Sequence, residues 1–234
     1  MVRSAVFSLL VLGTLTSGVW AEEQKSPSPF DEAIDYVEKH LIGKTLYEQR
    51  TIRFDQGGLE SELETRRMYM DMVRTSNMAM FHDVLIIRQK LWDLDETGKR
   101  ISETPRVKDR VLVSRYCFRK SDVTGEALGT IEPIVNSSAG TWGVTTEARL
   151  RVVEGKLRLE TGEHAFYGDG FAKGGGSRPI RVRVVETFNV VDGKLTAESF
   201  VTAYEVDPET LKPTSEPEEF RYKVVEIPGL LSVP

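Results

Sequence analysis

The sequence predicts a mainly β protein: an antiparallel meander of roughly ten strands, closed as a barrel or folded as two packed sheets, with one N-terminal helix. Two segments, 141–167 and 179–206, indicate this class, because each alternates apolar and polar residues on both sides of an X-Gly pair. Such a pair is typical of a two-residue hairpin turn with positive φ. A long meander resolves its two edges by closing on itself or by packing two sheets.

The second of these hairpins turns at Asp192-Gly193, and the turn fixes its register. Val184 is then expected opposite Val201, and Phe188 opposite Ala197. One face collects the apolar residues Ile180, Val182, Val184, Phe188, Val190, Leu195, Ala197, Val201 and Ala203. A slip of one residue would send all of them to the other face, so their agreement across both strands favours the pairing.

The first hairpin turns at Glu154-Gly155 and repeats the pattern. Leu150 is expected opposite Leu159, and Val152 opposite Leu157. The arginines of this hairpin point the other way. Charged residues on that outward face argue against an outer-membrane barrel, which needs an apolar outer band.

Two acidic residues interrupt the apolar face. Glu186 falls opposite Ser199, and Glu163 falls opposite Thr146. A buried carboxylate needs a partner or becomes protonated. One interpretation is a bulge near Val184 or Gly162 that returns the acid to solvent. The other is that both acids are polar anchors inside a ligand cavity with apolar walls.

The N-terminus is predicted to be a cleaved secretory signal over residues 1–21. Arg3 precedes an apolar run at 6–19, and Val19-Trp20-Ala21 fits a small-x-small cleavage site. The run is short for a spanning helix, which needs about 20 residues. We therefore expect a secreted or periplasmic protein with no transmembrane segment after signal removal.

The remaining elements follow in order. A flexible lead-in at 22–30 precedes one helix at 31–42, which Gly43 ends. Strands are predicted at 45–54, 59–66, 77–94, 107–119, 127–135 and 220–227, and a helix over 59–74 also fits the apolar spacing. A single domain over 31–228 and a tail at 229–234 complete the chain.

The composition and the motifs of the chain limit the classes of function that it can have. The net charge of −5 argues against a general nucleic-acid binder, whose affinity depends on phosphate neutralisation. Cys117 is the only cysteine, so it forms no internal disulfide, and we expect a buried, inert thiol. The chain has no Gly-x-Ser-x-Gly and no His-Glu-x-x-His motif, so we predict no catalysis and no cofactor.

An exported chain in which a helix leads into Leu41-Ile42-Gly43-Lys44 and then into a meander resembles the lipocalin or calycin type of barrel. The opening signature of that family is Gly-x-Trp, whereas this chain has Gly43-Lys44-Thr45. No functional residue carries over. The resemblance implies a cavity that holds a small apolar molecule.

The candidate ligand-binding residues lie in the hairpins and in the glycine-rich segment 164–177. That segment is either a mobile connection or a lid over the barrel mouth. The candidates are Glu163, Glu186 and Ser199 as polar anchors, with Trp142, Tyr167, Phe171 and Phe188 as aromatic contacts.

A methionine cluster allows a second function. On strands, Met68, Met70 and Met72 would share one face, as would Met78, Met80 and His82. Thioethers and an imidazole can bind Cu(I), and the same residues can equally fill a core. A third possibility is a structural or interaction domain with a filled core that docks a partner through Phe200 and Tyr204.

Overall fold

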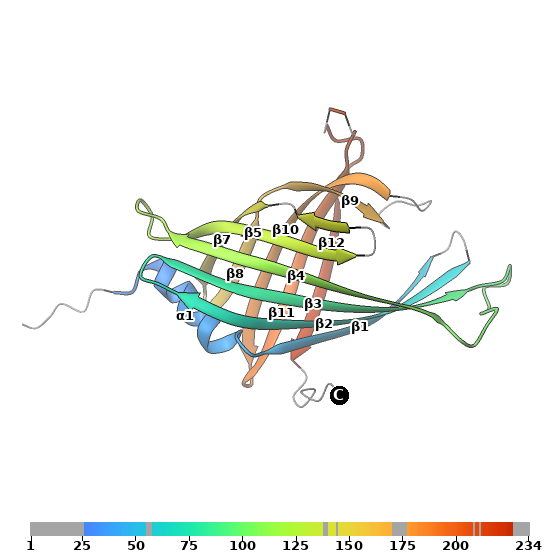
Figure 1. Ribbon diagram of the computed structural model, residues 1–234, viewed down its shortest axis with the longest axis horizontal. Helices are drawn as coiled ribbons and strands as arrows, with labels where there is room; N and C mark the ends of the chain where they lie inside the picture. The colour runs from blue at the N-terminus through green and yellow to red at the C-terminus, as the bar shows by residue number, and fades with distance from the viewer. Residues whose placement is uncertain are drawn as a thin grey trace, which may run out of the picture.

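The computed structural model describes residues 26–54, 58–137, 140–143, 145–169, 177–207, 209–210 and 212–226. These residues form a closed antiparallel barrel of ten strands, with a single helix near the N-terminus (Figure 1). The prediction of a barrel is therefore confirmed. The expected signal at 1–21, the tail at 229–234 and Phe171 lie outside the described residues.

Hydrogen-bonded neighbours run around the barrel in the order β10-β11-β12-β1-β2-β3-β4-β5-β7-β8 and back to β10. The ten strands are β1 (Thr45–Phe54), β2 (Leu59–Arg74), β3 (Met78–Asp93), β4 (Arg106–Lys120), β5 (Ala127–Ser137), β7 (Thr146–Val153), β8 (Lys156–Thr161), β10 (Ser177–Val191), β11 (Lys194–Glu205) and β12 (Glu218–Glu226). Two short strands lie beside this ring. β6 (Gly140–Gly143) pairs with β5, and β9 (His164–Asp169) pairs with β10.

Both predicted hairpin turns have the expected backbone. Asp192 and Gly193 have φ values of 50° and 75°, and Glu154 and Gly155 have 51° and 74°. The predicted partners are also confirmed, from Val184↔Val201 through Glu186↔Ser199 in the second hairpin to Leu150↔Leu159 in the first. The apolar face that results points into the barrel, because it carries the buried side chains of Val182, Phe188, Leu195, Ala197 and Ala203.

Helix α1 (Pro29–His40) closes one end of the barrel (Figure 1). It begins two residues before the predicted start, since Ser28 caps it and Pro29 occupies its first turn. Its buried face of Phe30, Ala33, Ile34 and Val37 joins one apolar core with Leu150, Leu157, Leu195 and Phe188. Tyr36 also donates its hydroxyl to the carbonyl of Phe188, at 3.2 Å. This half of the barrel is therefore filled.

Strands β2 and β3 are 16 residues each and extend with β1 and β4 beyond the rest of the barrel (Figure 1). The alternative of a helix over 59–74 is thus wrong, because β1 and β3 both pair with this segment. A bulge interrupts β2 at Asp71, where φ is 43° and the register shifts between Met70 and Met72. The bulge moves the following side chains to the opposite face of the sheet.

The first hairpin is shorter than predicted. β8 ends at Thr161, and Thr146 pairs with Ile131 of β5 instead of facing Glu163. Gly162 follows β8 and is not in a strand, so Glu163 leaves the apolar face and is exposed. The interpretation that Gly162 returns this acid to solvent is the correct one. No bulge occurs at Val184-Val185, where the pairing of β10 with β11 is continuous.

Candidate functional site

An internal cavity occupies the half of the barrel that α1 does not fill. Its volume is about 290 Å³. Strands β1, β2, β3, β10, β11 and β12 line it with Leu46, Glu48, Thr65, Arg67, Leu85, Ile87, Val184, Glu186, Ser199, Val201, Tyr222 and Val224. On β10 the cavity is lined by Val184 and Glu186, whereas Phe188 lies further toward the helix. The cavity therefore has largely apolar walls and a polar floor.

The floor is an ion network that joins strands distant in the sequence. Arg67 lies between two carboxylates: its Nε is 3.1 Å from Asp83 Oδ2, and its Nη1 contacts Glu186 Oε1. Ser199 donates its hydroxyl to Glu186 at 2.9 Å, and Tyr116 donates to Asp83 at 3.3 Å. Both acids are 3% exposed, whereas the Arg67 side chain keeps 25% exposure because it borders the cavity.

Burial sets the electrostatics of this floor. Burial raises the pKa of Asp83 to about 6, against the opposing effect of the Arg67 charge. Burial would lower the pKa of Arg67, but Asp83 and Glu186 outweigh that and hold it well above its usual value. The pKa of Tyr69 and of Tyr116 also rises well above the usual value because both rings are buried. Arg67 is therefore charged, and the two phenols are neutral, at physiological pH.

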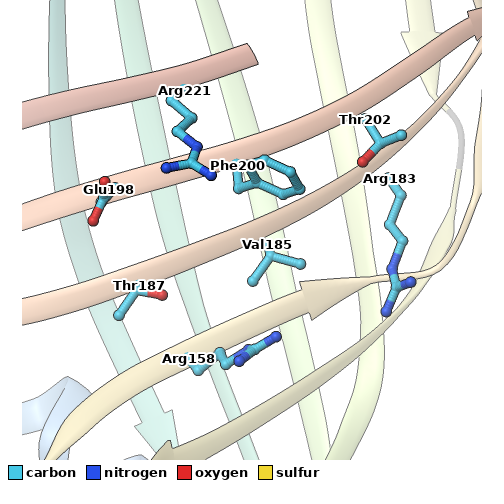
Figure 2. A pocket seen from close by; sticks show the side chains of 8 residues that line it. All are labelled: Arg158, Arg183, Val185, Thr187, Glu198, Phe200, Thr202 and Arg221. Atoms are coloured by element: carbon cyan, nitrogen blue, oxygen red, sulfur yellow. The ribbon is translucent and has the colours of Figure 1, made fainter. Parts of the chain in front are cut away.

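A second hollow lies on the outer surface of the barrel, over β8, β10, β11 and β12. Its volume is about 480 Å³. Figure 2 shows its lining of Arg158, Arg183, Val185, Thr187, Glu198, Phe200, Thr202 and Arg221. These residues alternate with the inward ones, since Val185 and Thr187 flank the buried Glu186.

The predicted ligand residues divide between several places. Glu186 and Ser199 line the cavity together. Phe188 lies in the filled half, edge-on to Tyr69 at 5.7 Å between ring centroids. Glu163 lies outside the barrel, where it accepts a hydrogen bond from Tyr204 at 2.9 Å and is 3.6 Å from Arg181.

The remaining aromatic candidates cannot be placed against the cavity. Trp142 is in β6 and Tyr167 is in β9, where the structure describes the strands and not these side chains. The expected position of Glu163 on the apolar face is wrong, because strand β8 ends at Thr161, before Glu163.

Met72 lies on the opposite face of the sheet from Met68 and Met70, so these three methionines do not share one face as predicted. Met72 packs against the internal core, because the bulge at Asp71 turns it inward. Met70 is paired with His82, and Met80 with Cys117, at positions that alternate with the inward Tyr69, Phe81 and Tyr116. Met68, Met78 and Met80 are half-buried, as is Cys117, so the prediction of a buried thiol is also wrong.

Sequence reasoning missed Arg67 and Asp83. Asp83 lies two residues from both Phe81 and Leu85 on β3, so the alternation of the strand predicts that its side chain points inward with theirs. Arg67 had no such signal, since its segment also fitted a helix. Among the described residues, no group of three or more His, Cys, Asp or Glu side chains is arranged to hold a metal ion.

Fold and cavity together define a closed antiparallel β-barrel with an internal space, an architecture compatible with ligand binding. Comparisons with protein-family models, with curated proteins and with solved structures gave no match. Across the part of the chain that the structure describes, no helix has the length and apolar character needed to cross a membrane.

Proposed function

We propose that the protein binds a small molecule with an apolar body and a polar head inside its barrel, and that it catalyses no reaction. The observation that carries this proposal is the 290 Å³ cavity, with its apolar walls above a buried ion network. Ligand sites are typically apolar pockets of about 300–1,000 Å³ with a few fixed polar groups. The ligand is therefore at the small end of that range.

The charges of the cavity favour a hydrogen-bond donor as the head of the ligand. One cation, Arg67, faces two acids on the floor, and Glu48 adds a third acid to the wall. An anionic head would meet this excess of carboxylates, whereas an amine or a hydroxyl would donate to them. Ser199 beside Glu186 offers a further polar contact.

Titration with three probes of equal chain length tests the proposal: decylamine, decanol and decanoate. We expect the amine and the alcohol to bind and the acid to bind at least ten times more weakly. Val184→Trp should abolish binding, because Val184 lines the cavity. Val185→Trp is the matched control, since Val185 is the next residue and faces outward.

Two results would refute the interior site. One is equal loss of binding in the two tryptophan variants. The other is failure of all three probes together with native mass spectra, from protein purified from its own host, that contain no bound small molecule.

Export and a lipocalin-like role belong to the same proposal. The apolar run at 6–19 and the small-x-small site that ends at Ala21 support cleavage before Glu22. N-terminal sequencing of the protein from its own host is expected to begin at Glu22. An N-terminus at Met1 would exclude a cleaved signal.

A copper site remains a second candidate, in a form revised by the structure. Met70 is paired with His82, and Met80 with Cys117, on adjoining strands. Directly opposed residues have Cβ atoms about 4.5–5.5 Å apart, so these soft ligands are neighbours. In a Cu(I) competition titration, Met70→Leu and Met80→Leu should weaken binding. Met72→Leu is the control, because that residue faces the core; an equal effect in all three would end the idea.

A further inference from the structure

The outer groove over β8, β10, β11 and β12 concentrates positive charge on an acidic protein. Arg158, Arg183 and Arg221 line it, and Glu198 is the one acidic residue among its lining. The hollow forms because the short side chains of Val185, Thr187 and Thr202 lie among these long ones (Figure 2). The lining therefore carries a net charge of about +2 in a chain whose net charge is −5.

Phe200 provides an apolar surface in the middle of this charge. It is paired with Val185 on one side and with Arg221 on the other. The Arg221 guanidinium lies 5.4 Å from the centroid of the Phe200 ring. Figure 2 shows Phe200 and Val185 between Arg221 on one side and Arg158 and Arg183 on the other.

Two of the arginines are available to a ligand. Arg158 Nε lies 2.6 Å from Glu160, which also pairs with Arg151, so Arg158 is already engaged in a contact within the protein. Within the described part of the chain, Arg183 and Arg221 form no direct salt bridge, although the Glu160 charge attracts Arg183 at longer range. A guanidinium presents a planar fork of donors that matches carboxylate and phosphate oxygens.

We propose that this groove binds a small planar anion, with an aromatic body on Phe200 and Val185 and carboxylate or phosphate groups held by Arg183 and Arg221. The volume of about 480 Å³ suits such a molecule. Acidic residues limit its size, because Glu198 lies in the groove and Glu219 is paired with Thr202 at its rim. A long polyanion would be repelled there. The site is on the opposite face of the sheet from the cavity, so it does not depend on the interior ligand.

Titration with naphthalene-2,6-dicarboxylate, followed by amide chemical shifts, tests the proposal. We expect saturable shifts that are largest at Val185, Phe200 and Thr202. Arg183→Ala and Arg221→Ala should each weaken binding at least tenfold. Arg119→Ala on β4 removes the same charge from an exposed arginine outside the groove and should change affinity less than twofold.

Two further measurements separate the contribution of the aromatic body to affinity from that of the charged groups. The neutral dimethyl ester of the probe should not bind, and inorganic phosphate should bind at least tenfold more weakly than the dicarboxylate. Phe200→Leu should weaken the dicarboxylate and leave phosphate unchanged.

The proposal is overturned if Arg119→Ala weakens binding as much as the groove variants, or if the shifts map to other strands. Equal affinity for phosphate and dicarboxylate would also overturn it. The same holds if poly-glutamate binds the groove while the small dicarboxylate does not, since the occupant would then be a polymer.

Discussion

Replacing Arg67 by methionine should strongly destabilise the protein at neutral and alkaline pH. Methionine keeps much of the apolar length of the side chain and removes the charge that Asp83 and Glu186 share. Both acids are 3% exposed, so both carboxylates are held away from water in the folded protein. Removing one partner of a buried ion pair costs about 3–5 kcal/mol, because an uncompensated charge remains.

The size of this loss should depend on pH in a defined direction. With Arg67 present, the pKa of Asp83 is about 6, and Arg67 lowers it more than the hydrogen bond from Tyr116 does. Without Arg67 the folded-state pKa rises further, while the unfolded value stays near 3.9. A folded pKa above the unfolded one means that the penalty is full above the folded pKa and disappears as the pH falls toward 4. The Arg67→Met protein should therefore be closest to wild type in mild acid.

Urea unfolding followed by circular dichroism at pH 5 and pH 8 measures both effects. We expect a loss of about 3–5 kcal/mol at pH 8 and a clearly smaller loss at pH 5. Adding Asp83→Asn and Glu186→Gln should recover most of the stability, since the floor is then neutral. A loss below about 1 kcal/mol at pH 8, or a loss that grows in acid, would refute the network as drawn.

Four further predictions test other parts of the structure. The Asp83 carboxyl should titrate near pH 6 by carbon NMR, and a midpoint at or below 4 would show that it is not desolvated. Gly129→Ala should cost about 1–3 kcal/mol in urea unfolding, because its Cβ would lie 1.9 Å from the Cys117 carbonyl, whereas Gly162→Ala, with nothing closer than 3.6 Å, should be near neutral. Asp31→Ala should lower the free energy of unfolding by about 1 kcal/mol at pH 7, because it removes a helix cap and an ion pair. The Ser28 hydroxyl and Lys120 lower the pKa of Asp31 to about 2. The loss should therefore vanish as the pH falls from 4 to 2. Phe188→Ala in the filled half should cost about 3–5 kcal/mol, but Val184→Ala beside the cavity should cost far less, and equal costs would contradict the division of the barrel.

The hairpins could be predicted from sequence because their information is local. The turns at Gly155 and Gly193 fix the register, and alternation across each turn then places every side chain. The inward position of Glu186 opposite Ser199 follows from the same argument. Local information left two positions of Glu163 open, because Gly162 breaks the alternation before it, and it failed at the Asp71 bulge before Met72.

The ion network could not be predicted because it is not local. Its members come from β2, β3 and β10, and the closure of the barrel brings them together. Each charge alone suggests an outward side chain, since an unpaired ion is costly to bury. Only the three together are compatible with burial, and the sequence gives no register that links Arg67 to Glu186.

The position of this network explains why one half of the barrel is filled and the other is open. Below it, α1 inserts Phe30, Ile34 and Val37 among the side chains of the closed end, so apolar packing completes that half. Above it, about a quarter of the Arg67 side-chain surface remains exposed toward the cavity. Collapse of the walls onto the floor would remove that contact with solvent or ligand and add to the cost of burying three charges. The network therefore acts as a floor against which the apolar walls cannot close, and the cavity is a property of the folded chain before any ligand binds.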